Sequence, residues 1–268
     1  MKLSLCAKIR ICLFALLVIP AAESYSAPRQ EKWVEHRAKH FLIYYKNVPQ
    51  DFIATLEEQA EYYFDEITHD LVVYRNTTWI QDNRARIYVY DDQQDYISAA
   101  NNMKWSHGIT ETRKKVIRTF PSSHGFFDST LPHELAHIIF REFVGFQSNV
   151  PTWLDEGVAT NQEKAKRWGA HKTVLNAIKQ GKFIPLGELK NVVLNQNVNQ
   201  EILNLYYAEA ASIVNFMKTE LGSFRFYNFC ENLKRGHSLD NAIKLTYVRF
   251  ENVDDLNKAW IKFLEDLD

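Results

Sequence analysis

His133-Glu134-Leu135-Ala136-His137 is the most informative stretch of this 268-residue sequence. Two histidines four residues apart on a helix project from one face, one turn above the other. This spacing suits two nitrogen ligands of a tetrahedral Zn²⁺, with Glu134 within reach of a bound water. Two hydrogen-bonded histidines on an amphipathic helix would give the same five residues. The stretch alone therefore predicts a zinc site without excluding a purely structural helix.

A catalytic zinc site needs a third protein ligand and leaves its fourth position to water. A third histidine six residues after the second is excluded, because Phe143 stands there and Phe140 three residues earlier. The segment Trp153-Leu154-Asp155-Glu156-Gly157-Val158-Ala159 offers Glu156 instead, after a gap of 18 residues. Residues 145–151 have the composition of a turn. We expect two antiparallel helices, with Glu156 facing the histidine pair.

Strand patterns precede helical patterns along the chain. His40–Tyr45, Ala85–Tyr90 and Lys114–Phe120 carry the aromatic and β-branched residues typical of strands, and Asp51–Thr68 has apolar residues at helical spacing. A helix is expected from about Pro132 to Phe143, and a second begins at Thr152. Further helical patterns cover 169–180, 203–220, 223–234, 238–246 and 254–267. Strands early and helices late predict an α+β fold rather than alternating βαβ units.

The two motifs and their 18-residue gap resemble the gluzincin metallopeptidases. They are similar to the M1 aminopeptidases, whose pattern is HExxH-x18-E with the glutamate inside WLxEGxA, and most similar to the smaller bacterial peptidase MA-like proteins. The resemblance covers about residues 105–220. It implies a zincin-like (thermolysin-like) fold, a peptide or protein substrate and one Zn²⁺ per chain. The implied zinc ligands are His133, His137 and Glu156, with Glu134 as general base.

The resemblance also implies a tyrosine that stabilises the oxyanion. In the family this tyrosine begins a pattern like Y-x-K-G-A-S, and Tyr207-Ala208-Glu209-Ala210-Ala211-Ser212 aligns with it, which favours Tyr207 over Tyr206. The Lys-Gly of the pattern is replaced by Glu209-Ala210. Both tyrosines could equally be core aromatics at the start of a helix.

Two carboxylates near the third ligand are candidates for positioning the histidines. Ligating histidines usually donate their other N–H to a carboxylate or carbonyl. Asp155 adjoins Glu156, and Glu163 returns to the same helix face two turns later and matches a glutamate of the M1 pattern. The alternative for each is a solvated helix charge.

The segment before the histidines resembles the substrate-binding GxMEN motif of the M1 enzymes only in part. Gly108 and Glu111 occupy the glycine and glutamate positions, whereas methionine and asparagine are missing. Gly108 and Glu111 are therefore candidate substrate-binding residues, with Glu111 as an amine ligand. The other interpretation is that this segment and Lys114–Phe120 form an edge strand that pairs with a peptide substrate.

Residues 1–27 have the pattern of a secretory signal peptide. Basic residues precede the apolar run Ile11–Ile19, and small residues follow it. This run is too short for a membrane span, which needs about 20 residues, so we expect cleavage between Ala22 and Ala27 and no stable span afterwards. Only Cys230 of three cysteines would remain, which excludes an internal disulfide. The pattern predicts an exported bacterial protein, periplasmic or secreted, with a single catalytic domain over 28–268.

Composition limits the remaining function classes. The 13 Tyr, 17 Phe and 6 Trp with a net charge of −1 exclude a disordered chain. No basic excess exists to bind phosphates, so a nucleic-acid partner is not expected, and the oligomeric state is not predicted. The favoured function is an exported zinc metallopeptidase. A non-catalytic zinc module for binding or scaffolding and a metal-free α+β binding protein stay as alternatives.

Overall fold

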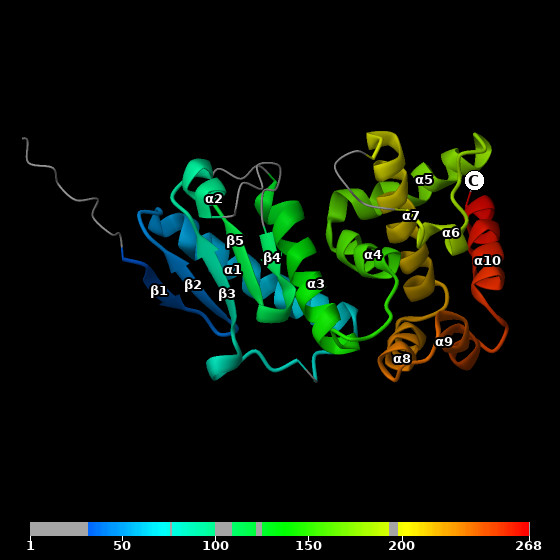
Figure 1. Ribbon diagram of the computed structural model, residues 1–268, viewed down its shortest axis with the longest axis horizontal. Coiled ribbons are helices and arrows are strands. Elements are labelled where there is room, and N and C mark those ends of the chain that lie inside the picture. The colour runs from blue at the N-terminus through cyan, green and yellow to red at the C-terminus, as the bar shows by residue number, and fades with distance from the viewer. Residues whose placement is uncertain (1–31, 76, 100–108, 122–124, 193–197, 268) are drawn as a thin grey trace, which may run out of the picture. The chain divides into compact units, whose positions relative to one another are not determined.

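Five strands form one sheet in the N-terminal half of the protein (Figure 1). The computed structural model describes residues 32–75, 77–99, 109–121, 125–192 and 198–267. The predicted signal peptide, residues 1–27, lies outside the described residues. Residues Trp33–Asp268 form one compact unit. The strands are β1 Val34–Arg37, β2 Phe41–Tyr45, β3 Ala85–Val89, β4 Ile109–Glu111 and β5 Val116–Thr119.

The sheet is mixed, with the strand order β1-β2-β3-β5-β4. The three inner strands run parallel, and each edge strand is antiparallel to its neighbour. Side chains alternate along β2, where Phe41, Ile43 and Tyr45 are buried, because successive residues of a strand face opposite sides. The strand-bearing half is therefore confirmed as predicted.

Strands precede helices as the α+β prediction requires, but the sheet contains one βαβ connection that the prediction did not include. Helix α1, Gln50–Asp70, connects β2 to the parallel strand β3. Parallel neighbours need a crossover connection, and a helix of this length supplies it. Its buried positions, among them Ile53, Leu56 and Ala60, recur at helical spacing and pack on the sheet side. The sequence predicted both strands and the helix, but it did not predict that the helix makes β3 run parallel to β2.

Helices make up the C-terminal half, as predicted, and their starts differ by a few residues from the expected ranges (Figure 1). After the short α2, Gln93–Ala99, the helices are α3 Leu131–Val144, α4 Thr152–Gln162, α5 Lys164–Lys179, α6 Leu186–Leu189, α7 Gln200–Thr219, α8 Ser223–Lys234, α9 Leu239–Thr246 and α10 Val253–Asp266. Gly145 ends α3 with a φ of 89°. Among these described helices, none is long and apolar enough to cross a bilayer.

Helix α3 joins the two halves. It packs against α1 on one side and against α4 on the other. A π-helical turn, Phe126–Thr130, precedes it, and Pro132 lies in its first turn, where the missing N–H costs no hydrogen bond. Three of its residues, Leu135, Ile138 and Ile139, are fully buried. The histidine helix is thereby held rigidly on the core.

The contact between α4 and α7 is unusually close. A Cβ atom on Gly157 would lie 2.3 Å from the carbonyl oxygen of Ala210, so only glycine fits there. Asn161 strengthens the contact, because its buried amide donates to the carbonyl oxygens of Gly157 at 2.7 Å and Ala211 at 2.8 Å. This contact brings the face of α4 that carries Glu156 next to α7.

Hydrogen bonds around Ser212 tie α5 and α10 to α7. The indole N–H of Trp260 donates to Ser212 Oγ at 3.0 Å. His171 on α5 lies 2.8 Å from Ser212 Oγ through Nδ1 and 3.0 Å from Asn215 Oδ1 through Nε2. Buried polar side chains that satisfy one another in this way hold helices in a single register. His171 is thus part of this network.

Glu209 is a fully buried carboxyl group on α7. Its Oε1 accepts the N–H of Ile184 at 2.9 Å, and Oε2 has no hydrogen-bond partner among the described residues. Burial raises the pKa of Glu209 to about 8, and the bond from Ile184 offsets this only in part. The carboxyl group therefore keeps its proton at neutral pH.

This proton makes stability depend on pH. The unfolded chain releases it near the ordinary pKa of 4.5, whereas the folded chain holds it to about 8. The contribution of Glu209 to stability is thus present below 4.5 and declines through this window by up to about 1.4 kcal/mol per pH unit. We expect Glu209→Gln to remove this decline. Urea unfolding of both proteins at about pH 5.5 and about pH 7.5 measures it, with the exposed Glu265→Gln as control; parallel pH profiles would contradict the expectation.

Candidate metal centre

The two histidines of α3 meet at their outer ring nitrogens. His133 Nε2 and His137 Nε2 lie 3.1 Å apart. Both side chains are mostly buried, with 17% and 15% of their surfaces exposed. The i, i+4 spacing on a helix places them together, as the sequence predicts.

Glu156 completes a group of three possible ligands. Its Oε2 lies 3.5 Å from His133 Nε2 and 3.7 Å from His137 Nε2. Among the described residues, these three are the group of histidine, cysteine and acidic side chains that could hold a metal ion. Helix α4 brings Glu156 to the histidines, because α4 packs on α3 on one side and on α7 on the other.

The spacing of the three atoms fits a metal ion. A tetrahedral ion bound at about 2.0–2.2 Å separates its ligand atoms by about 3.3–3.6 Å. The observed separations of 3.1, 3.5 and 3.7 Å lie close to this range. Two nitrogen lone pairs and a carboxylate oxygen that converge in this way form a donor set suited to a divalent cation.

Each histidine also bonds a carboxylate through its inner ring nitrogen. His133 Nδ1 lies 2.9 Å from Glu163 Oε1. His137 Nδ1 lies 3.0 Å from Asp155 Oδ1. A histidine that donates from Nδ1 keeps the lone pair of Nε2 free for a metal. The structure thus places Asp155 and Glu163 where an orienting role requires them.

Further side chains hold these two carboxylates in place. Arg141 Nε donates to Asp155 Oδ2 at 2.7 Å. Glu163 is 98% buried and accepts from Ser129 and from Lys166 Nζ, the latter at 2.8–2.9 Å. Each carboxylate therefore has a fixed orientation toward its histidine.

Sequence analysis missed these three supporting side chains. Arg141 follows His137 by four residues on α3, and this spacing could have identified it. Lys166, near the start of α5, pairs with Glu163 three residues earlier. Ser129 lies in the π-helical turn, for which the sequence shows no signal.

The acidic side chains favour positive charge at the imidazoles. Burial opposes a charge on His133, but the bonds to Glu156 and Glu163 outweigh it and raise the pKa of His133 to about 9. Burial likewise opposes a charge on His137, and Asp155 outweighs it and raises the pKa of His137. The site is therefore built to hold a cation, whether protons or a metal ion occupy it.

Among the acidic side chains around the two histidines, Glu134 is the one whose carboxylate is not bonded to another described side chain. Its negative charge contributes to the raised pKa values of His133 and Tyr207, which places it beside both. No described residue donates a hydrogen bond to Glu134 or forms an ion pair with it. Its carboxylate can therefore accept a proton from a water bound at the site.

Two adjacent tyrosines on α7 approach the site. Burial and then the charge of Glu156 raise the pKa of both Tyr206 and Tyr207. For Tyr207 the value is about 12, with further contributions from Glu163 and Glu134. Tyr206 is fully buried and its hydroxyl has no partner among the described residues, whereas Tyr207 is half-buried and lines an open cavity. Tyr207 is thus the one with access to a substrate.

The two candidate substrate-binding residues are not brought into the group. Gly108 lies outside the described residues. Glu111 is the last residue of β4, and its oxygens pair with Lys114 at 2.6 Å and Arg118 at 2.5 Å. A substrate amine would have to displace these cations. The edge-strand expectation holds for β4 and is wrong for β5, which lies between β3 and β4 because Ile109–Glu111 covers its outer side.

Fold and site together define a metallopeptidase-type module. A family model described as the Peptidase MA superfamily matches residues 68–266, most of the chain. The chain therefore belongs to the Peptidase MA superfamily. The match begins in α1 and ends in α10, so it extends on both sides of the segment that carries the motif resemblance. No curated protein matches the chain.

The carboxylate behind His133 gives a prediction about metal affinity. Glu163→Gln keeps the shape of the side chain but removes the charge that orients His133, and we expect metal affinity to fall by about 10–100-fold. Competition with a chromophoric chelator measures this affinity. The control is Glu188→Gln, an exposed glutamate on α6. Equal affinity of Glu163→Gln and wild type would contradict the orienting role.

Proposed function

We propose that the protein is a zinc-dependent peptidase that hydrolyses peptide bonds. The observation that carries the proposal is the unpartnered carboxylate of Glu134 next to three convergent ligand atoms. A site that only stabilises the fold would be closed by a fourth protein ligand, whereas the described residues supply three, and their side chains are partly exposed. Membership of the Peptidase MA superfamily supports a peptide or protein substrate.

In the proposed mechanism, His133, His137 and Glu156 hold the zinc ion. When bound, zinc polarises a carbonyl oxygen and lowers the pKa of water to about 7. Glu134 accepts the proton of the attacking water and delivers it to the nitrogen of the leaving amine. A carboxylate without a hydrogen-bond partner is free to make both transfers.

Tyr207 would stabilise the negative charge that develops on the carbonyl oxygen. A pKa of about 12 keeps its hydroxyl protonated at neutral pH, so it can donate a hydrogen bond. The peptide backbone would lie along the edge strand β4, whose outer side pairs with no strand in the part of the chain that the structure describes. Tyr207 and Glu134 would then act on the same peptide bond.

We also propose that the protein is exported. The support is the pattern of residues 1–27, a basic start, a short apolar run and small residues after it. Mass spectrometry of the protein recovered outside the cytoplasm tests this independently of catalysis. Export predicts a molecular mass that matches a chain beginning between residues 23 and 28.

Glu134→Gln is the direct test of the general base. We expect it to bind about one zinc per chain, as wild type does, and to lose about 10²–10⁴-fold in kcat. Cleavage of casein and of mixed fluorogenic peptides, with metal content by atomic emission, gives both quantities. His137→Ala should lose zinc as well as activity.

The alternatives give different results in the same experiment. A wild type that holds zinc but cleaves no peptide would favour the non-catalytic zinc module. A wild type without zinc would favour the metal-free binding protein. Full activity of Glu134→Gln would remove Glu134 from the mechanism.

The two tyrosines provide a matched pair of variants. We expect Tyr207→Phe to lower kcat by about 10²–10³-fold through the loss of one donor to the developing oxyanion. Tyr206→Phe removes only a buried hydroxyl without a partner and should leave kcat and stability nearly unchanged. Steady-state kinetics on one peptide compares them, and the reverse ranking would assign the role to Tyr206.

A further inference from the structure

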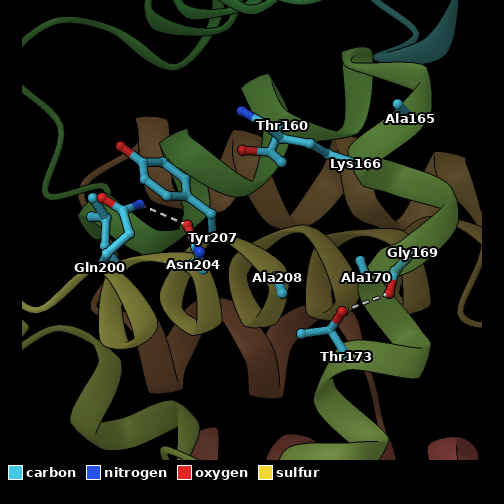
Figure 2. A pocket seen from close by; sticks show the side chains of 11 residues that line it. Thr160, Ala165, Lys166, Gly169, Ala170, Thr173, Gln200, Asn204, Tyr207 and Ala208 are labelled. Atoms are coloured by element: carbon cyan, nitrogen blue, oxygen red, sulfur yellow. Dashed lines mark hydrogen bonds between the residues drawn. The ribbon is translucent and has the colours of Figure 1, made fainter. Parts of the chain in front are cut away.

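A cavity of about 400 Å³ lies beside Tyr207. It is lined by the last turn of α4, the first half of α5 and one face of α7 (Figure 2). Tyr207 and Gln200 lie toward one end, and Gly169 and Thr173 toward the other (Figure 2). Cavities that hold whole ligands start at about 300 Å³. At about 400 Å³ this one lies near the lower end of that range, so it has room for one large side chain.

Three residues of the cavity wall, Thr160, Lys166 and Tyr207, connect it to the surroundings of the metal centre. Thr160 in its wall follows Glu156 by four residues on α4, so both lie on one face of that helix. Lys166 in the same wall pairs with Glu163, the partner of His133, and its Nζ lies 5.8 Å from the ring centroid of Tyr207. A substrate that reaches Tyr207 thus has the cavity directly next to it.

The wall of the cavity favours an uncharged occupant. Four of its residues are small, and none is acidic; Ala165, Gly169, Ala170 and Ala208 supply the room. A lysine or arginine side chain of the substrate would lie near the positive charge of Lys166, and no acidic residue lines the cavity to pair with the incoming side chain. An acidic side chain would compete for Lys166 with Glu163, which is buried and also bonded to His133.

We propose that this cavity binds one side chain of the substrate, next to the peptide bond that is cut, and selects bulky uncharged side chains. The proposal rests on the peptidase function proposed above. Phenylalanine, tyrosine, leucine and methionine fit the volume of the cavity and the charge of its wall.

Gly169 allows the cavity to be filled without disturbing the fold. A Cβ atom built on Gly169 meets nothing within 4 Å, and its φ lies outside the left-handed region. Leucine at this position should extend into the cavity and favour the helix over glycine. Lys172→Leu is the matched control, because it adds leucine to an exposed position of α5 that does not line the cavity.

The test uses alanine hexapeptides in which one residue, at each position in turn, is phenylalanine, glutamate or lysine. Cleavage is measured with the zinc-loaded protein, and binding is measured separately by calorimetry with Glu134→Gln, alone and combined with Gly169→Leu or Lys172→Leu. We expect phenylalanine at one position to bind and be cleaved at least about tenfold better than alanine, the effect of a large apolar group entering a pocket. Gly169→Leu should abolish this preference and leave the all-alanine peptide within about twofold; Lys172→Leu should keep the preference.

The outcomes separate the cavity from the catalytic proposal. Selective binding that Gly169→Leu abolishes, without cleavage by the wild type, would refute the peptidase and keep the cavity. Equal binding of alanine and phenylalanine peptides, a preference for glutamate or lysine, or a phenylalanine preference that survives Gly169→Leu would overturn the cavity proposal.

Discussion

The close contact of α4 with α7 is the constraint on which the rest of the site depends. Glu156 can face both histidines only if α4 stays at one distance from α3 and α7. The absence of a side chain at Gly157 permits this distance, and the buried amide of Asn161 bridges the helices, with one hydrogen bond to Gly157 on α4 and one to Ala211 on α7. The same contact places Tyr207 opposite the third ligand. One glycine therefore couples the ligand set to the group that would stabilise the oxyanion.

The charges around the two histidines explain why Arg141 and Lys166 belong to the site. Four carboxylates surround two imidazoles, which is more negative charge than two protonated histidines would neutralise. Two of the carboxylates are offset by cations, Asp155 by Arg141 and Glu163 by Lys166. The remaining charge on Glu134 and Glu156 matches one divalent ion. Two protonated imidazoles would neutralise the same charge, which agrees with the raised pKa of both histidines.

Local patterns predicted the parts of the site that lie on single helices. The histidine pair and the strand and helix ranges follow from spacing alone, because period and hydrophobicity decide them. The parallel crossover through α1 did not follow, since a pattern of elements does not state which way a strand runs. Ser129 and the covering of β5 by β4 also depend on contacts between distant segments. Glu111 was predicted from its place in a motif, and its pairing with Arg118 becomes visible only when the two strands lie side by side.

Tyr207 lies between the metal centre and the cavity. Its ring forms a wall of the cavity, and its hydroxyl lies in the field of the three catalytic-site carboxylates. A side chain seated in the cavity would press on this ring and exclude water from it. Water exclusion strengthens a hydrogen bond to a developing charge, so a well-fitting substrate would gain in kcat as well as in binding. If Tyr207 has both proposed roles, substrate choice would be part of catalysis rather than a separate step.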